Sequence, residues 1–140
     1  MRCCDKKNSK STLFLAIFAV LLFFSSCKKE AGEGGNASIR GKVWVKDYNA
    51  NFTVLNSEYP GADEDVYIIY GDDISYGYRV KASPDGSFEF KYLRKGKYKI
   101  YIYSKDKTLT SPSLMTSIEV EASISKNKEK VDVGTIEIYN

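Results

Sequence analysis

From Ser38 onward, apolar and polar residues alternate along most of the chain. Residues 39–46 are typical: isoleucine, glycine and two valines take every second position, and charged residues or tryptophan fill the positions between them. A period of two is the pattern of a β-strand that buries one face. Six further runs share it, at residues 66–70, 78–81, 88–92, 98–103, 118–121 and 131–138. Because no helical period occurs after Ser38, these runs predict an all-β, seven-stranded antiparallel sandwich.

Turn-forming residues separate the runs. Gly, Asp, Pro and Lys are concentrated at residues 71–73, 84–86 and 94–96, and Gly86 is expected to have a positive φ. In the last run the apolar phase shifts by one residue across Gly134, which predicts a β-bulge. Residues 47–64 show no alternation and form an unusually long predicted loop, a feature typical of functional segments.

The N-terminus has a different pattern. Residues 13–24 are all apolar, and as a helix they would span roughly 18 Å, less than the ~30 Å hydrocarbon core of a bilayer. Four basic residues precede this stretch, and Ser25, Ser26 and Cys27 follow it. This order resembles a bacterial lipoprotein signal, whose cysteine is lipidated with fatty acids such as palmitate and becomes the mature N-terminus. The alternatives are a short buried helix and an ordinary signal peptide.

The resemblance implies three parts: a lipoprotein signal peptide at 1–26, the lipidated Cys27 with a flexible tether to residue 37, and one domain at 38–140. The lipid anchor would hold the protein in the cell envelope, with the outer membrane the expected location. The chain has a net charge of +3, but the signal carries four of its 21 basic and one of its 18 acidic residues. The remainder is therefore neutral, with 17 of each sign, and gives no support for nucleic-acid binding.

A second resemblance rests on the order Asp85-Gly86, Phe88, Phe90, Leu93, Gly96 and Tyr98. These spacings resemble the core motif of carboxypeptidase regulatory-like domains, which are similar to transthyretin and to repeats of bacterial surface adhesins. The resemblance covers residues 38 to about 104. It implies a prealbumin-like (Ig-like) sandwich, and it implies no enzymatic activity, because such domains serve mostly as spacers, scaffolds or binding modules.

The residue types also argue against catalysis. The chain has no histidine, and its three cysteines lie at or before position 27, so Ser-His-Asp triads and His-ligated zinc are excluded. No phosphate-binding glycine loop is present. We expect a non-enzymatic protein without a cofactor or metal. Asp63, Glu64 and Asp65 suggest a calcium site as an alternative, although solvated loop ends are the simpler interpretation.

Two candidate binding surfaces follow. In the main hypothesis, the protein is a binding or scaffold module whose membrane-distal loops contact an envelope protein. The residues assigned to that surface are Tyr48, Phe52, Tyr59, Asp63, Glu64, Asp65 and Asp85. The tether would share the opposite, lysine-rich end with turns 71–75, 94–96 and 123–130, facing the lipid headgroups.

The alternative hypothesis is a carbohydrate-binding accessory lipoprotein. Trp44, Tyr67, Tyr101 and Tyr103 fall on the outward phase of their runs, where exposed rings can stack on sugars. A simpler role for these rings is cross-strand pairing that stabilises the sheet. By the same alternation, Tyr78 and Tyr92 fall on the inward phase.

Overall fold

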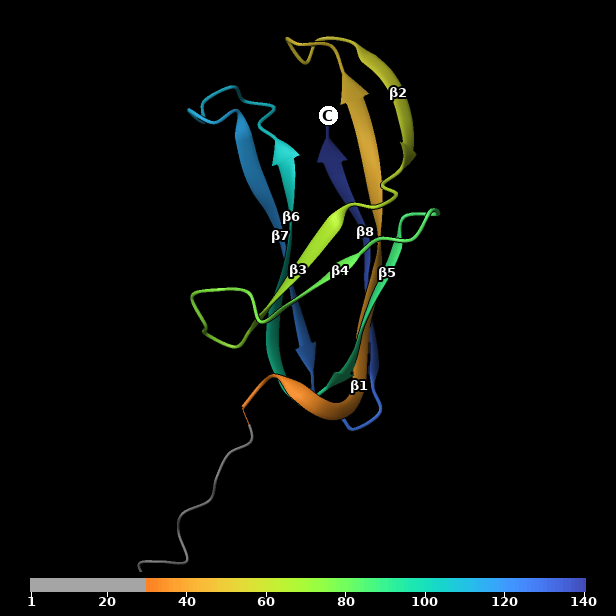
Figure 1. The fold of residues 1–140 in the computed structure, drawn as a ribbon, viewed down its shortest axis with the longest axis vertical. Coiled ribbons are helices and arrows are strands. Elements are labelled where there is room, and N and C mark those ends of the chain that lie inside the picture. The colour runs from red at the N-terminus through yellow and green to blue at the C-terminus, as the bar shows by residue number, and fades with distance from the viewer. Residues whose placement is uncertain (1–29) are drawn as a thin grey trace, which may run out of the picture.

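The structure, a computed structural model, describes residues 30–140, which form two four-stranded β-sheets packed face to face (Figure 1). The predicted signal peptide and Cys27 lie outside the described residues. Within residues 30–140, no helix is long and apolar enough to cross a membrane. The all-β sandwich predicted from the alternation is confirmed.

Each sheet combines strands from distant parts of the sequence. Sheet A contains β1 (Glu33–Tyr48), β2 (Leu55–Pro60), β5 (Ser87–Leu93) and β8 (Lys130–Tyr139). Sheet B has the order β4-β3-β6-β7, with β3 (Asp65–Tyr70), β4 (Tyr78–Lys81), β6 (Gly96–Lys105) and β7 (Met115–Ile124).

The strand count and one strand direction differ from the prediction. An eighth strand, β2, lies inside the predicted loop 47–64 and pairs with the second half of β1. Five of its six residues are exposed, so it shows no alternation in the sequence and is held mainly by backbone hydrogen bonds. In addition, β8 runs parallel to β1, although β1 is antiparallel to both β2 and β5.

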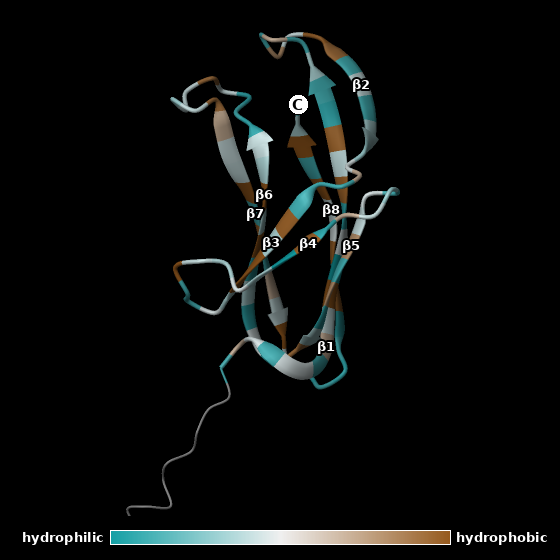
Figure 2. Ribbon diagram, in the orientation of Figure 1, coloured by the Kyte–Doolittle hydropathy of each residue, from teal (hydrophilic) through white to brown (hydrophobic). Residues whose placement is uncertain are grey.

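The predicted inward positions form the core. Figure 2 shows apolar and polar bands alternating along the strands. The largest fully buried side chains come from β1, β3, β5 and β6, and include Tyr98, Ile39, Ile68, Leu93, Ile100 and Ile102. Burial of this apolar surface is the main favourable term in folding.

The end of β5 departs from the predicted alternation. Tyr92 was expected to point inward, but it has a φ of 59° and is 72% exposed, whereas Leu93 is only 2% exposed. Phe90 and Leu93 are three positions apart on β5, whereas their partners Ile39 and Ala37 are only two positions apart on β1, so β5 has one extra residue here. This β-bulge reverses the side-chain phase, so that Leu93 enters the core.

The sandwich begins earlier than predicted. Strand β1 starts at Glu33, so residues 33–37 of the predicted tether belong to sheet A. The glycines in this segment conceal the strand, because they provide no apolar period. Tyr98 holds the segment in place: its hydroxyl accepts a hydrogen bond from Gly32 N at 3.1 Å and donates one to Arg94 O at 2.6 Å. Such a bond to backbone a few residues upstream resembles the tyrosine corner of other sandwiches.

The bulge predicted at Gly134 is confirmed. Arg40 pairs with Asp132 and Lys42 with Thr135, so β8 has one extra residue beside Gly41. Gly134 has a φ of 75°, a conformation that glycine adopts readily. Gly41 is tightly enclosed at this point: a Cβ there would lie 2.8 Å from Phe88 Cζ and 2.9 Å from Gly134 O.

We expect Gly41→Ala to destabilise the domain by about 1–3 kcal/mol, because the added methyl overpacks the contact between β1, β5 and β8. Gly134→Ala meets no neighbouring atom and should cost about 1–2 kcal/mol, through its left-handed backbone alone. Urea denaturation of both variants measures the two effects. A smaller loss for Gly41→Ala than for Gly134→Ala would contradict the packing argument.

Tyr98→Phe should lower the free energy of unfolding by about 1–3 kcal/mol, because the buried Gly32 N–H loses its acceptor. The exposed Tyr76 provides the matched control, and Tyr76→Phe should change stability by less than about 0.5 kcal/mol. Thermal unfolding of the two variants tests this. Equal stabilities would show that the Tyr98 hydroxyl does not hold the start of β1.

Candidate functional site

A group of four tyrosines covers the outward side of sheet B. Three were predicted to point outward, namely Tyr67 on β3 and Tyr101 and Tyr103 on β6, and the fourth is Tyr76 from the segment before β4. Tyr67 pairs with Tyr101 across the sheet, and Tyr101 pairs with Glu119 on β7. We refer to Tyr67, Tyr76, Tyr101 and Tyr103 as the tyrosine face.

The rings of the tyrosine face contact one another in two ways. Tyr67 and Tyr101 are stacked, with centroids 4.9 Å apart and planes 10° apart. Tyr103 lies edge-on to both, at 5.7 Å and 5.6 Å, and Tyr76 lies edge-on to Tyr67 at 5.0 Å. Since Tyr76 and Tyr103 are 51% and 52% exposed, they present the accessible aromatic surface, and the half-buried stacked pair supports them.

Charged groups border the tyrosine face on two sides. On β4, Arg79 pairs with Tyr67 in register, and its guanidinium lies 3.3 Å from the Asp65 carboxylate. A hydrogen bond with Tyr67, helped by Asp65, raises the pKa of Arg79 above its ordinary value. On β7, Glu119 provides a carboxylate beside Tyr101. Burial raises the pKa of Tyr101, so its hydroxyl stays protonated at neutral pH. The surface combines apolar rings with hydrogen-bonding groups of both kinds.

The fourth residue predicted for a glycan surface lies elsewhere. Trp44 is on β1 of sheet A, between the inward-facing Val43 and Val45, and its indole N–H donates to Glu58 at 3.4 Å. It therefore faces outward from the opposite sheet and does not join the tyrosines. The alternation placed each residue on a side of its strand but could not assign strands to sheets. Tyr76 was missed because it lies outside any alternating run.

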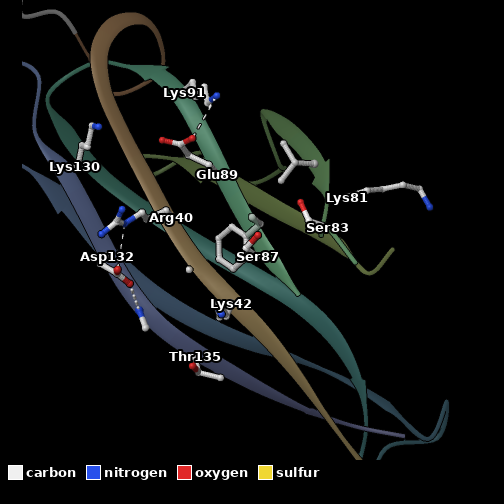
Figure 3. A pocket seen from close by; sticks show the side chains of 14 residues that line it. Arg40, Lys42, Lys81, Ser83, Ser87, Glu89, Lys91, Lys130, Asp132 and Thr135 are labelled. Atoms are coloured by element: carbon white, nitrogen blue, oxygen red, sulfur yellow. Dashed lines mark hydrogen bonds and ion pairs between the residues drawn. The ribbon is translucent and has the colours of Figure 1, made fainter. Parts of the chain in front are cut away.

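A hollow of about 950 Å³ lies elsewhere, on the outward side of sheet A and the edge of β4. Figure 3 shows that its walls are polar, with Arg40 paired to Asp132 at 3.2 Å and Lys91 paired to Glu89 at 3.4 Å. Its one aromatic residue, Phe88, is 4% exposed and belongs to the core. The hollow therefore lacks an aromatic surface on which a ring could stack.

Comparison with known proteins identifies the family. Residues 51–128, more than half of the chain, match the family described as polysaccharide lyase family 4, domain II. The chain belongs to this family. The match indicates a sandwich of the fibronectin type III kind and covers strands β2 to β7. This match does not test the resemblance to carboxypeptidase regulatory-like domains, which stays a prediction.

Several solved structures resemble the chain only loosely. A candidate carbohydrate-binding protein from Pseudomonas aeruginosa is 10% identical, with a TM-score of 0.44 over 79% of this chain and 92% of that one. (S)-Allantoin synthase is 9% identical, with a TM-score of 0.41 over 73% and 42% of the two chains. The major pilin subunit of Bacillus cereus is 14% identical, with a TM-score of 0.40 over 74% and 30%. None of the curated proteins matches the chain.

The residues predicted to form the partner surface lie in two separate places. Tyr48 and Phe52 lie at the end opposite the start of β1, where their rings are 5.8 Å apart and pack against Tyr139 at 6.0 and 6.4 Å. The Lys107 ammonium lies 4.9 Å from the Tyr48 ring and contacts Tyr139 in the same way. Tyr59 is nearby on β2, since its hydroxyl accepts a hydrogen bond from Asn140 at 3.4 Å.

The acidic residues assigned to that surface lie in the segments that lead into β3 and β5 and at the start of β3. Asp85 accepts hydrogen bonds from the Ser87 hydroxyl and N–H, which lower its pKa and stabilise the turn before β5. Asp65 pairs with Arg79, and burial raises the pKa of Glu64. Across residues 30–140, no group of three or more acidic, histidine or cysteine side chains is arranged to hold a metal ion.

The end at which β1 begins matches the predicted arrangement of turns. Ser38 N donates to Glu129 O, Gly71 N donates to Lys97 O, and Arg94 N donates to Gly32 O, each at 2.9 Å. The predicted tether therefore adjoins the turns near 71, 94 and 128. Lys95, Lys97, Lys126 and Lys128 are exposed there, beside several carboxylates.

Asp106 organises the long loop between β6 and β7, at the distal end. As a residue, Asp106 is 7% exposed. One oxygen accepts from the Thr108 N–H and hydroxyl, and the other accepts from Thr110 and from Ser111 N at 2.7 Å. These hydrogen bonds hold the pKa of Asp106 far below its ordinary value. Its role was not predicted, although Asp followed by Thr at two and four positions is typical of such turns.

Because the folded pKa of Asp106 lies below its unfolded value of about 3.9, its stabilising effect is complete above that pH and declines as the pH falls. We expect Asp106→Asn to lower the Tm at pH 7, since the amide replaces one acceptor with a donor. The Tm of the variant should also fall less steeply than that of the wild type between about pH 5 and 2.

Calorimetry across this pH range measures both effects. The control is Asp72→Asn, which removes an exposed turn carboxylate. Identical acid profiles for Asp106→Asn and the wild type would show that the Asp106 carboxylate does not stabilise the loop.

Proposed function

We propose that the protein is a non-enzymatic accessory module that binds a polysaccharide on the tyrosine face. The observation that carries the proposal is the cluster of four tyrosines, of which two are half exposed, on one side of sheet B. A sugar ring has C–H groups on its faces and hydroxyls around its edge. The rings of Tyr76 and Tyr103 suit those faces, and Arg79 and Glu119 suit the hydroxyls.

Membership of the polysaccharide lyase family 4 domain II family supports this proposal, because the family's description links the domain to enzymes of polysaccharides. The match is to a domain of such enzymes and gives no reason to assign lyase chemistry to this chain. The absence of histidine from the sequence is consistent with a role in binding.

We further propose that the protein acts at the cell envelope, anchored by lipid on Cys27 as the sequence predicts. Cys27 is three residues before the first described residue, so the anchor would adjoin the end where β1 begins. In this arrangement the domain would hold a polysaccharide close to the membrane.

A protein partner at the distal end is the second candidate. Its support is the group of exposed apolar side chains in and beside the loops of that end, namely Val54, Leu55, Leu109, Leu114 and Met115. Exposed apolar clusters of this kind often mark interaction sites.

We expect Tyr103→Ala and Tyr76→Ala each to weaken polysaccharide binding by about tenfold, the loss of roughly one aromatic contact. The matched control is Trp44→Ala, which removes an aromatic side chain from the opposite sheet and should change the affinity by less than about twofold. Glycan-array screening followed by titration calorimetry measures these changes.

The opposite result is equally informative. If Trp44→Ala abolishes binding and the two tyrosine variants keep it, the site lies on sheet A. If the wild-type protein binds no glycan and a distal-loop variant, Leu114→Ala, loses a co-purifying protein, the second candidate is favoured.

A further inference from the structure

A hollow with an aromatic lining lies at the open side of the sandwich, between β4 and β5. It forms because β4 pairs only with β3 and β5 pairs only with β1, so neither strand has a neighbour on this side. The hollow has a volume of about 550 Å³, within the range of small-molecule sites. We call it the β4–β5 groove. Its aromatic lining comes from Tyr70, Tyr78, Phe90 and Tyr92.

Tyr92 has an unusual backbone for its position. Among residues 30–140, six non-glycine residues have a positive φ, and five of them lie in turns or loops. Tyr92 is the exception, because its φ of 59° occurs inside strand β5. A left-handed conformation is unfavourable for a bulky side chain, and glycine or asparagine adopts it more easily. The strained backbone presents the ring to solvent at the rim of the groove, where it is 72% exposed.

The other tyrosines complete the aromatic lining. Tyr78 lies on the inward phase of β4, opposite Ile68, yet it is 52% exposed because no strand covers this edge. Tyr70 is more buried, packs edge-on against Tyr98 at 6.0 Å, and its hydroxyl donates to Glu33 at 3.2 Å. Burial, reinforced by Glu33, raises the pKa of Tyr70 to about 12. It therefore contributes a neutral, hydrogen-bonded ring to the lining of the groove.

Polar groups lie at the same rim. Glu89 and Lys91 of β5 form an ion pair at 3.4 Å and are both substantially exposed. Together with Glu33, they provide acceptors and a donor next to the aromatic surface. A saccharide needs this combination, since its ring faces are apolar and its edge carries hydroxyls. A purely apolar ligand would displace water from these polar groups without offering them hydrogen bonds in return.

We propose that the β4–β5 groove is a second saccharide-binding site, in which Tyr92 and Tyr78 contact sugar rings and Glu89 and Lys91 bind their hydroxyls. This inference rests on the proposed function, because it assigns the same class of ligand to another surface. Strand β4 contributes to both sites: Tyr78 lines the groove, and the neighbouring Arg79 borders the tyrosine face.

The deciding variant is Tyr92→Gly, which removes the ring and also relieves the left-handed backbone. If the ring had only a structural role, its loss would lower the Tm. A binding role predicts a Tm equal to or above that of the wild type, with about tenfold weaker saccharide binding. Lys128→Gly is the matched control, since Lys128 also has a φ of 59° but lies in the turn before β8. It should leave binding unchanged.

The experiment uses the full-length protein and defined oligosaccharides of two to eight units derived from xylan, galactan and polygalacturonate. Titration calorimetry gives the affinities, and Tyr78→Ala and Tyr92→Asn serve as second variants if Tyr92→Gly does not fold. Weaker binding by the groove variants with an undiminished Tm supports the proposal. If Tyr103→Ala weakens binding while every groove variant stays within twofold of the wild type, the groove is not a binding site, but the proposed function stands. No binding by the wild type overturns both.

Discussion

The fold depends on one strand that hydrogen-bonds along both of its edges. Strand β1 is 16 residues long, and it pairs with β5 in its first half, with β2 in its second half, and with β8 on the other edge. Its side chains alternate between core and outer face from Ile39 to Val45, because one face of this stretch contacts the core. Where β5, β1 and β8 come closest, the strand has Gly41, and β8 accommodates the contact with the bulge at Gly134. The register of sheet A is fixed at this point.

The alternation of apolar and polar residues predicts one part of this fold and leaves another part undetected. Alternation locates the buried positions of β1, β3, β5 and β6, because each of these strands has one face in the core. It also locates the bulge at Gly134, which changes the apolar phase. It cannot detect β2, because the side chains of that strand are almost all exposed. Nor can it show that β8 is parallel to β1, because parallel and antiparallel strands have the same period of two. Tyr92 was assigned to the core because the sequence gives no sign of the β5 bulge, and Leu93 takes the buried position.

The candidate site was predictable to a similar degree. The outward phase of Tyr67, Tyr101 and Tyr103 follows from the alternation, and their contact follows from the pairing of β3 with β6. Trp44 satisfies the same rule but belongs to the other sheet, and only the three-dimensional pairing separates it from the tyrosines. Tyr76 reaches the tyrosine face from an irregular segment, so no period could have assigned it. Asp106 likewise depends on a loop conformation in which five donors converge on one carboxylate.

The distribution of aromatic residues bears on the choice between a structural and a binding role. A stacked pair such as Tyr67 and Tyr101 is explained by sheet stability alone, because cross-strand aromatic pairs contribute up to about 1 kcal/mol. Stability does not explain why Tyr76, Tyr78, Tyr92 and Tyr103 are each more than half exposed. It explains Tyr92 least, since the strained backbone at this residue opposes folding while its ring contributes little burial. Unfavourable features of this kind are commonest where a surface serves a ligand, and here they lie on both sides of β4, the shortest strand of the sandwich.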